Sequence, residues 1–259
     1  MSTEKRIDAA KSRLVDLQAQ VKGLLKSERK AGVAVENEAT ESEAETVRFF
    51  RLKGAGIPRR YWGGFSTFDA ARRPEHGPLV EVALSWVERQ KRLKTERSTF
   101  GAPTPSRQGL SMSGATGCGK SHLAAAVAGL CIEAKISLLW VNVAELVGSI
   151  KASWSPSEPG TTADIVNELT QTDILVLDDL GIEPPKDWVL DILYLIINRR
   201  YEDGTTLIWT SNYDGAQLRD RWSAAGDTAA RIISRLAEMV KSVGKFPEVD
   251  LRKENGAGR

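Results

Sequence analysis

The residues whose types and spacing point most clearly to chemistry are 114–121, which read G-A-T-G-C-G-K-S. They match the G-x-x-x-x-G-K-[ST] pattern, in which glycines let backbone N–H groups converge on phosphate oxygens. In this pattern Lys120 binds the β- and γ-phosphates, and the Ser121 hydroxyl holds Mg²⁺. We therefore predict that the chain binds a nucleoside triphosphate with Mg²⁺. The predicted nucleotide-binding residues here are Gly114, Ala115, Thr116, Gly117, Cys118, Gly119, Lys120, Ser121 and His122.

A second motif follows further along the chain, where the apolar run 174–177 ends in two acids. Asp178 is placed to orient Mg²⁺ through water, and Asp179 to polarise the attacking water as a general base. The run 178–181 also fits the D-x-x-G of a GTPase. However, no guanine-reading N-K-x-D follows it, and no L-S-G-G-Q of an ABC-type ATPase is present. ATP is therefore the expected nucleotide.

Three further polar side chains complete the candidate catalytic set. Asn212 follows the apolar run 207–209 and is expected to lie between the γ-phosphate and the attacking water, although a turn asparagine alone is unremarkable. Arg231 and Arg235 lie four residues apart on one predicted helix face. Two interpretations of these arginines stay open. They form a solvated basic face, or one of them reaches a neighbour's γ-phosphate, where such a residue contributes about 10³–10⁵ in rate.

The bulk composition restricts the class of protein. The length of 259 residues suits one mid-sized domain with an appendage, and the net charge of +2 is too mild to indicate a nucleic-acid partner. Two cysteines, Cys118 and Cys131, exclude a disulfide framework or a four-cysteine zinc site and fit a reducing compartment. The charged N-terminus and the absence of an apolar run of ~20 residues predict a soluble, cytoplasmic protein.

Apolar periodicity predicts strands that alternate with helices. Strands are expected at residue 110 and at 136–141, 173–177, 206–210 and 239–243. Helices are expected at 78–93, after the phosphate loop, at 144–151, before 171, and at 188–201, 217–221 and 228–236. Continuous apolar strands separated by helices indicate a parallel sheet covered on both faces. The expected fold is a three-layer α/β domain with a parallel five-stranded sheet.

The first part of the chain has a different pattern. Apolar residues recur there at alternating spacings of three and four, as a short heptad stripe: Ile7, Ala10, Leu14, Leu17, Val21 and Leu24. A stripe this short is expected to dock on a partner or on a second local helix. After the acidic run 36–45, the G-A-G-I-P sequence at 54–58 marks a boundary. We predict a small all-helical segment at 1–55, followed by an ATPase domain at 56–259.

In its order of motifs the chain resembles the AAA+ ATPases of the DnaC/DnaI helicase-loader group and the related IstB-type transposition helper ATPases. The resemblance rests on GATGCGKSHLAAAVA, ILVLDDLG, TSN and RIISRL, with G-I-P at 56–58 and G-F-S-T-F at 64–68. It implies that the P-loop, acidic and amide motifs correspond to Walker A (Lys120, Ser121), Walker B (Asp178, Asp179) and sensor 1 (Asn212).

The resemblance also implies roles near the C-terminus. Arg235 matches the arginine finger that acts in trans, with Arg231 nearby, and Arg252 matches a sensor-2-like arginine that contacts nucleotide. The few residues after 243 imply no full helical lid, which fits the loader group. His76 and His122 have no second metal ligand in view and are interpreted as structural. Cys118, inside the loop, predicts a thiol-sensitive ATPase.

As a function, the resemblance implies ATP-dependent loading of a hexameric replicative helicase onto DNA in replication initiation. The N-terminal segment would bind the helicase, because its apolar stripe has nothing local to cover it. Single-stranded DNA would contact the insert near Lys151 and Trp154, a phosphate-binding cation and a stacking ring, although a surface loop with a tucked tryptophan is equally open. Two alternatives remain: a helper ATPase that binds duplex DNA and a transposase, and a nucleotide-gated helicase adaptor with little turnover.

Overall fold

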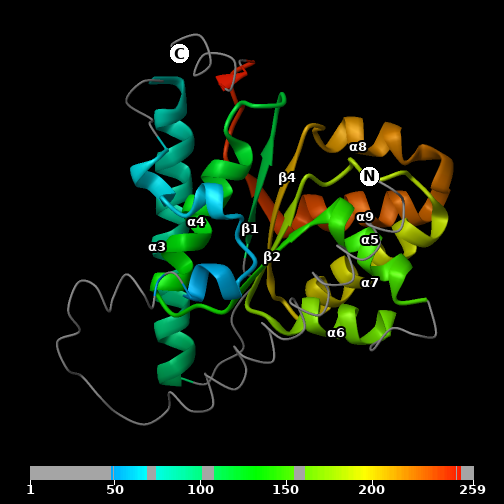
Figure 1. Cartoon of the computed structure of the whole chain (residues 1–259), viewed down its shortest axis with the longest axis horizontal. Helices are drawn as coiled ribbons and strands as arrows, with labels where there is room; N and C mark the ends of the chain where they lie inside the picture. Colours follow the sequence, from blue (N-terminus) through cyan, green and yellow to red (C-terminus); the bar gives the residue numbers. More distant parts are fainter. Residues whose placement is uncertain are drawn as a thin grey trace.

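The computed structural model describes residues 48, 50–68, 74–100, 108–154, 161–248 and 250–251. The expected heptad stripe, the acidic run and Arg252 lie outside these residues. Within the described ranges the chain forms one sheet with helices on both of its faces (Figure 1). No helix in these ranges is long and apolar enough to cross a membrane.

The sheet has five parallel strands in the order β2-β3-β4-β1-β5. Their bounds are Gly109–Ser113 (β1), Leu138–Asn142 (β2), Ile174–Asp178 (β3), Thr206–Ser211 (β4) and Val240–Ser242 (β5). The four longer strands are buried almost throughout, as a sheet covered on both faces requires. The parallel five-stranded sheet and the three-layer architecture predicted from the sequence are therefore confirmed.

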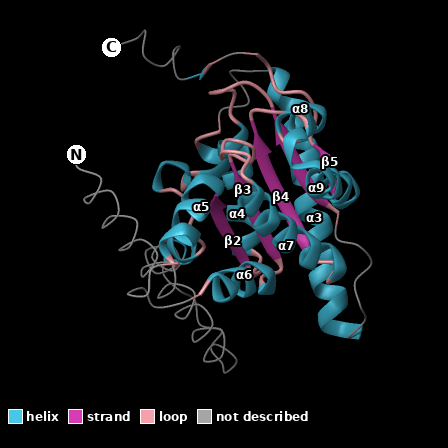
Figure 2. Ribbon diagram, turned by 90° about the vertical axis from the view of Figure 1, so that its right-hand side faces the viewer, coloured by secondary structure: helices cyan, strands magenta, loops and turns pink. Residues whose placement is uncertain are grey.

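The helices divide between the two faces of the sheet (Figures 1 and 2). One face is covered by α3 (Gly77–Phe100) and α4 (Lys120–Glu133). The other face is covered by α5 (Val143–Ala152), α6 (Thr162–Gln171), α7 (Asp187–Glu202), α8 (Gly215–Arg221) and α9 (Gly226–Met239). Each layer buries its own apolar cluster against the sheet, so the sheet separates two hydrophobic cores.

Capping residues determine where several of these helices begin. The Asn142 side chain ends β2 and accepts hydrogen bonds from the first turn of α5. Thr161 and Asp164 form a capping box at α6, and Asp214 and Gln217 form another at α8. The predicted starts at 144 and 217 agree with the observed starts at 143 and 215, while no start was predicted for α6.

The segment before α3 covers an exposed strand edge. Leu52, Ala55 and Ile57 are buried, and the Ala55 carbonyl accepts a hydrogen bond of 2.7 Å from the backbone N–H of Trp140 on β2. Three short 3₁₀ helices follow, η1 (Arg59–Tyr61), η2 (Gly64–Ser66) and η3 (Pro74–His76); a fourth, η4 (Ser223–Ala225), joins α8 to α9. The first two lie against α4, and His76 of η3 hydrogen-bonds with the Cys118 carbonyl in the phosphate loop.

Candidate nucleotide-binding site

The predicted site residues meet at the carboxyl edge of the sheet. The phosphate loop follows β1, Asp178 ends β3, and Asn212 follows β4. Because β4 lies between β3 and β1, all three motifs reach the same place although they lie far apart in the sequence. Ligands bind at this edge in open parallel α/β sheets.

The phosphate loop adopts backbone angles that only glycine tolerates readily. Gly117 and Gly119 have φ values of +81° and +101°. A Cβ atom on Gly117 would collide with the carboxylate of Asp250, and one on Gly114 would lie 2.9 Å from the Phe246 side chain. The Leu251 N–H also donates to the Gly117 carbonyl at 3.1 Å. The loop is therefore packed against the segment that follows β5.

Lys120 is the central cation of the site. It is 5% exposed, and its Nζ donates to the carbonyls of Gly114 at 2.9 Å and Ala115 at 2.8 Å. A third bond, of 3.0 Å, reaches Oδ1 of Asn212. The structure thus joins the predicted Walker A lysine directly to the predicted sensor asparagine. An ammonium group held by neutral oxygens can exchange them for phosphate oxygens, to which charge-assisted bonds are stronger.

Asp178 and Ser121 form an oxygen-rich pair beside this lysine. Asp178 is 2% exposed and accepts a 2.7 Å hydrogen bond from the Thr210 hydroxyl. Burial raises the pKa of Asp178, while hydrogen bonds from Thr210 and Ser121 and the charge of Arg60 act in the opposite direction. A serine hydroxyl and a carboxylate are ligands that Mg²⁺ accepts, so these residues fit the ion. Bound there with nucleotide, Mg²⁺ would neutralise phosphate charge.

Asp179 lies just past the strand in a left-handed conformation, with φ of +60°. Its N–H donates to the Thr210 hydroxyl at 3.0 Å, and its Oδ2 accepts from the Asn142 amide at 3.2 Å. A positive φ at a residue that is not glycine is uncommon, and such conformations cluster at active sites. The two acids therefore differ: Asp178 is buried, and Asp179 is partly exposed at the turn.

Aromatic and histidine rings line the side of the loop nearest the 3₁₀ helices. The His122 ring lies 5.6 Å from Tyr61 and 5.3 Å from Phe68, and its Nε2 hydrogen-bonds with the Thr67 hydroxyl at 2.9 Å. Burial lowers the pKa of His122. The buried His76 hydrogen-bonds with the Cys118 carbonyl at 3.0 Å through Nε2. These contacts agree with the structural interpretation of both histidines.

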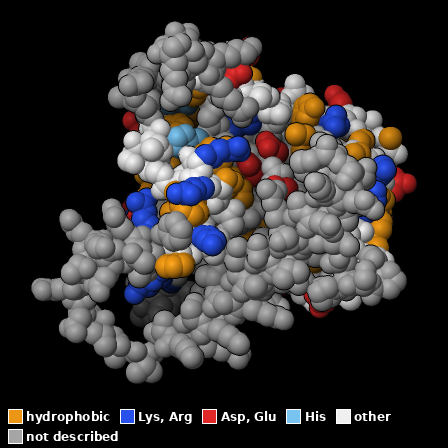
Figure 3. Space-filling model, in the orientation of Figure 1, with side chains coloured by type: hydrophobic (Ala, Val, Ile, Leu, Met, Phe, Trp, Pro, Cys, Tyr) orange, Lys and Arg blue, Asp and Glu red, His pale blue; other side chains and the backbone are white. Residues whose placement is uncertain are grey.

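The molecular surface shows the same arrangement from outside. In Figure 3, lysine and arginine side chains lie between a histidine surface on one side and a group of acidic side chains on the other. The described part of the segment before α3 carries five exposed cations: Arg48, Arg51, Lys53, Arg59 and Arg60. Of these, Arg60 acts electrostatically on Asp178.

Cys118 is fully buried inside the loop, and burial raises the pKa of its thiol although Lys120 acts in the opposite direction. A buried thiol with a raised pKa is chemically inert. The structure therefore argues against the expected thiol sensitivity of the site.

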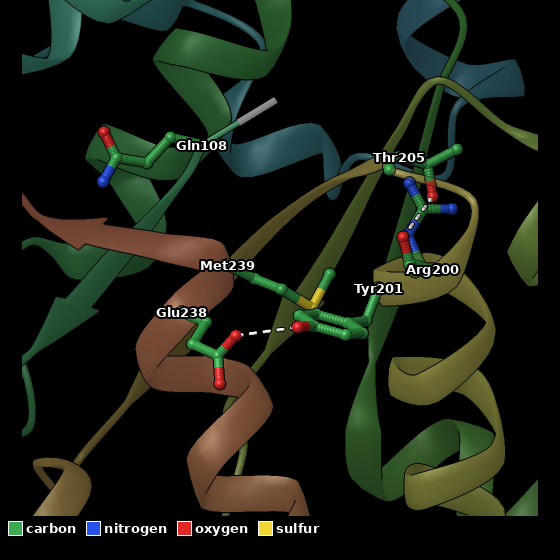
Figure 4. Close-up of a pocket in the computed structure, with 7 residues that line it drawn as sticks. Gln108, Arg200, Tyr201, Thr205, Glu238 and Met239 are labelled. Carbon is green, nitrogen blue, oxygen red and sulfur yellow. Dashed lines mark hydrogen bonds between the residues drawn. The ribbon is translucent and has the colours of Figure 1, made fainter. Parts of the chain in front are cut away.

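The two candidate finger arginines lie on α9, in the helix layer opposite α4. Arg231 is exposed, while Arg235 is half-buried with its guanidinium over the rings of Tyr194, at 5.1 Å, and Tyr201, at 5.6 Å. The Tyr201 hydroxyl donates to Glu238 at 2.8 Å (Figure 4). Arg235 is thus held against α7 of its own chain, and its action in trans stays a prediction.

A small pocket lies beside this contact (Figure 4). It is lined by Gln108, Arg200, Tyr201, Gly204, Thr205, Glu238 and Met239. Gln108 and Thr205 directly precede β1 and β4. The pocket is therefore at the amino edge of the parallel sheet, opposite to the phosphate loop.

The two candidate DNA-contact residues lie at and just beyond the end of α5. Lys151 is exposed in its last turn, and Trp154 is 54% exposed. The Trp154 ring lies 4.7 Å from the Trp188 ring of α7, and its indole N–H donates to the Thr162 hydroxyl at 3.2 Å. Trp154 is therefore neither tucked into the core nor without contacts, and its role stays a prediction.

Some residues of the site were not predicted from the sequence. Thr210 bridges Asp178 and the Asp179 backbone, and Asn142 binds the Asp179 carboxylate. Thr210 belongs to the T-S-N phrase and ends a strand, so its position next to the acids was a usable signal. Asn142, by contrast, looks like an ordinary helix cap, and only the pairing of β2 with β3 reveals its contact.

A parallel α/β sheet defines a P-loop protein of the AAA+ type when it carries a glycine-rich phosphate loop after β1, two acids at the end of β3 and an asparagine after β4. The comparison with protein families agrees. Residues 89–243 match the family of IstB-like ATP binding proteins, and the chain belongs to this family.

Several relatives are named as helicase loaders. The chain is 30% identical over 124 residues to the "Replicative helicase loader DnaC" of Buchnera aphidicola subsp. Acyrthosiphon pisum, covering 48% of each chain. It is 33% identical over 89 residues to the DnaC of Escherichia coli, covering 34% of this chain and 36% of the relative. The matched regions thus span about half, or less, of these relatives. The crystal structure of DnaI superposes with a TM-score of 0.51 and 26% identity over 65% of this chain and 81% of that one.

Proposed function

We propose that the chain hydrolyses ATP with Mg²⁺. The observation on which this rests is the convergence of Lys120, Asn212 and the Asp178–Ser121 pair at one edge of the sheet. Lys120 would bind the β- and γ-phosphates, and Ser121 and Asp178 would hold the ion. Asp179 would accept a proton from the attacking water, because its carboxylate lies at the turn and is partly exposed.

We further propose that hydrolysis serves the loading of a hexameric replicative helicase onto DNA. The names of the relatives support this role. Residues 1–55 would bind the helicase and residues 56–259 would form the ATPase domain. Arg235, with Arg231 beside it, would complete a neighbour's site on self-association, and Lys151 and Trp154 would contact single-stranded DNA. Arg252 would contact nucleotide.

Two other functions use the same site. The family match to IstB-like proteins favours, as a second candidate, a transposition helper that binds duplex DNA and a transposase. The third candidate is an adaptor that binds ATP and occupies a helicase with little turnover. The presence of both acids, Asp178 and Asp179, counts against this third candidate.

Turnover is tested with Asp179→Asn, which keeps the shape of the side chain and removes its basicity. We expect the variant to bind a fluorescent ATP analogue as the parent does and to lose ATP turnover in a phosphate-release assay. Normal hydrolysis by Asp179→Asn would exclude Asp179 as the base. A parent chain that binds but does not turn over ATP would favour the adaptor.

The partner is tested by size-exclusion chromatography with light scattering. The full chain, or residues 48–259, is mixed with the host's replicative helicase in the presence of ATP; the shorter chain keeps Leu52 and Ala55, which pack on the ATPase domain. We expect co-elution of the full chain and its loss with the shorter chain, which would assign the N-terminal segment to helicase binding. The absence of a complex with either chain would shift the assignment to the transposition helper.

A further inference from the structure

The turn that follows β3 is held by hydrogen bonds on one side from β4. The Leu180 N–H donates to the Thr210 carbonyl at 2.8 Å, and the Ser211 hydroxyl donates to the Leu180 carbonyl at 2.5 Å. Together with the bond from the Asp179 N–H to the Thr210 hydroxyl, these contacts fix the first half of the turn. The second half of the turn begins at Gly181. It is closed by a longer bond of 3.3 Å from the Ile182 N–H to the Asp179 carbonyl and is contacted by one buried side chain.

Gly181 has a left-handed backbone conformation, and its surroundings leave no room for a side chain. Its φ is +89°, and a Cβ atom there would collide with Leu218 of α8 and lie 3.1 Å from the Tyr213 ring. The position therefore requires glycine. The Gly181 N–H meets Oε2 of Glu183 at 2.8 Å.

Glu183 is unusual for an acidic residue in a loop. It is 1% exposed, whereas its neighbour Ile182 is 51% exposed. Burying a carboxyl group is costly unless the fold supplies hydrogen bonds. Burial raises the pKa of Glu183, and the Gly181 N–H and the Arg221 charge act in the opposite direction. The burial of this carboxyl group indicates that its hydrogen bond to the Gly181 N–H helps to hold the turn in one conformation.

The backbone of Glu183 also contacts α8, which follows the sensor loop. Arg221 of α8 donates to the Glu183 carbonyl at 3.4 Å, and its guanidinium lies 5.1 Å from the Tyr213 ring. Tyr213 directly follows Asn212. Glu183 thus lies between the turn that carries Asp179 and the loop that carries Asn212.

We propose that Glu183 is a positioning residue for Asp179: by accepting the Gly181 N–H, it completes the turn that directs the Asp179 carboxylate. This inference rests on the proposed ATPase function. An error of about 1 Å in the placement of a catalytic group can cost on the order of a hundredfold in rate. Glu183 touches no reacting atom, so it acts on the rate of hydrolysis and leaves nucleotide binding to the phosphate loop.

The test compares Glu183→Ala, Glu183→Gln and a matched control in the full chain. The control is Glu168→Ala on α6, because burial also raises the pKa of Glu168, to about 7, far from the turn. We measure kcat for ATP hydrolysis and the Kd of a non-hydrolysable ATP analogue. We expect Glu183→Ala to lower kcat about ten- to hundredfold with Kd within about twofold. Glu183→Gln retains the acceptor oxygen and should keep kcat within about threefold of the parent.

Several results would overturn the inference. A parent-like kcat in Glu183→Ala would show that the bond to Gly181 does not matter for hydrolysis. Equal losses in Glu183→Ala and Glu168→Ala would reduce the effect to general stability, and equal losses in both Glu183 variants would assign it to charge. If Asp179→Asn and the parent hydrolyse ATP equally, the proposed role of Asp179 fails first. A parent-like Glu183→Ala beside an inactive Asp179→Asn removes only the positioning role.

Discussion

Two buried cations lie at opposite ends of the same sheet and are held in different ways. At the carboxyl edge, Lys120 shares its three donors between two carbonyls of its own loop and Asn212. At the amino edge, Arg200 on α7 is fully buried. Its guanidinium donates at 2.6–3.2 Å to the carbonyls of Leu169, Thr172, Asp173 and Thr206.

The two cations illustrate a contact that stabilises the fold and a contact that is available for ligand binding. Arg200 joins the end of α6 to the starts of β3 and β4, and its planar fork binds several carbonyls whose positions the fold has fixed. Lys120 is a point charge on a flexible stem, and its partners are loop groups that phosphate oxygens can replace. Similar burial thus serves a permanent contact at one edge of the sheet and an exchangeable one at the other.

The largest effect on stability is expected from removal of the permanent contact, which Arg200 makes. Arg200→Met should lower the free energy of unfolding by about 3–5 kcal/mol, because several buried carbonyls lose their donor. Arg199→Met is the control, since Arg199 makes one exposed hydrogen bond, to Asn167, and should cost less than about 1 kcal/mol. Urea unfolding followed by circular dichroism measures both. Equal losses would contradict the distinction between the two arginines.

A smaller change in stability, with a large change in binding, is expected at the other edge. Lys120→Ala should weaken ATP binding at least about a hundredfold, which corresponds to about 3 kcal/mol. It should lower the free energy of unfolding by less than Arg200→Met does. Titration with a fluorescent ATP analogue and urea unfolding give the two values, with the exposed Lys245→Ala as control. A Lys120→Ala chain that binds ATP normally would refute the exchangeable contact.

The smallest effect concerns Glu168, next to the Leu169 carbonyl that Arg200 binds. Burial raises the pKa of Glu168 from 4.5 to about 7. The folded chain therefore holds its proton more tightly than the unfolded chain, so Glu168 lowers stability as pH rises from about 4.5 to 7. Glu168→Gln should stabilise the protein at pH 8 by roughly 1 kcal/mol after solvent screening, and hardly at pH 5. Urea unfolding at both pH values measures this stabilisation. An equal stabilisation at pH 5 and pH 8 would contradict the assignment of the raised pKa to Glu168.

Local sequence was sufficient to predict the motifs and the order of elements. The phosphate loop, Asp178 and Asn212 were predictable because each lies at the end of an apolar strand, and parallel strands bring such ends to one edge. Arg200 and Glu183 were not predictable. In sequence, Arg200 is one of two adjacent arginines and Glu183 one acid in a loop, and only packing distinguishes the buried member from its exposed neighbours. The roles proposed for residues 1–47 and for Arg252 stay predictions, because these residues lie outside the described ranges.

Asn142 serves two partners with one planar group. Its Oδ1 accepts from the N–H groups of Ala144 and Glu145 at the start of α5, while its Nδ2 donates to Asp179. A rigid plane cannot turn toward one partner without leaving the other. A rotation of the Asp179 carboxylate that keeps this hydrogen bond therefore requires the Asn142 amide to move, and with it the cap of α5, the helix that leads to Trp154.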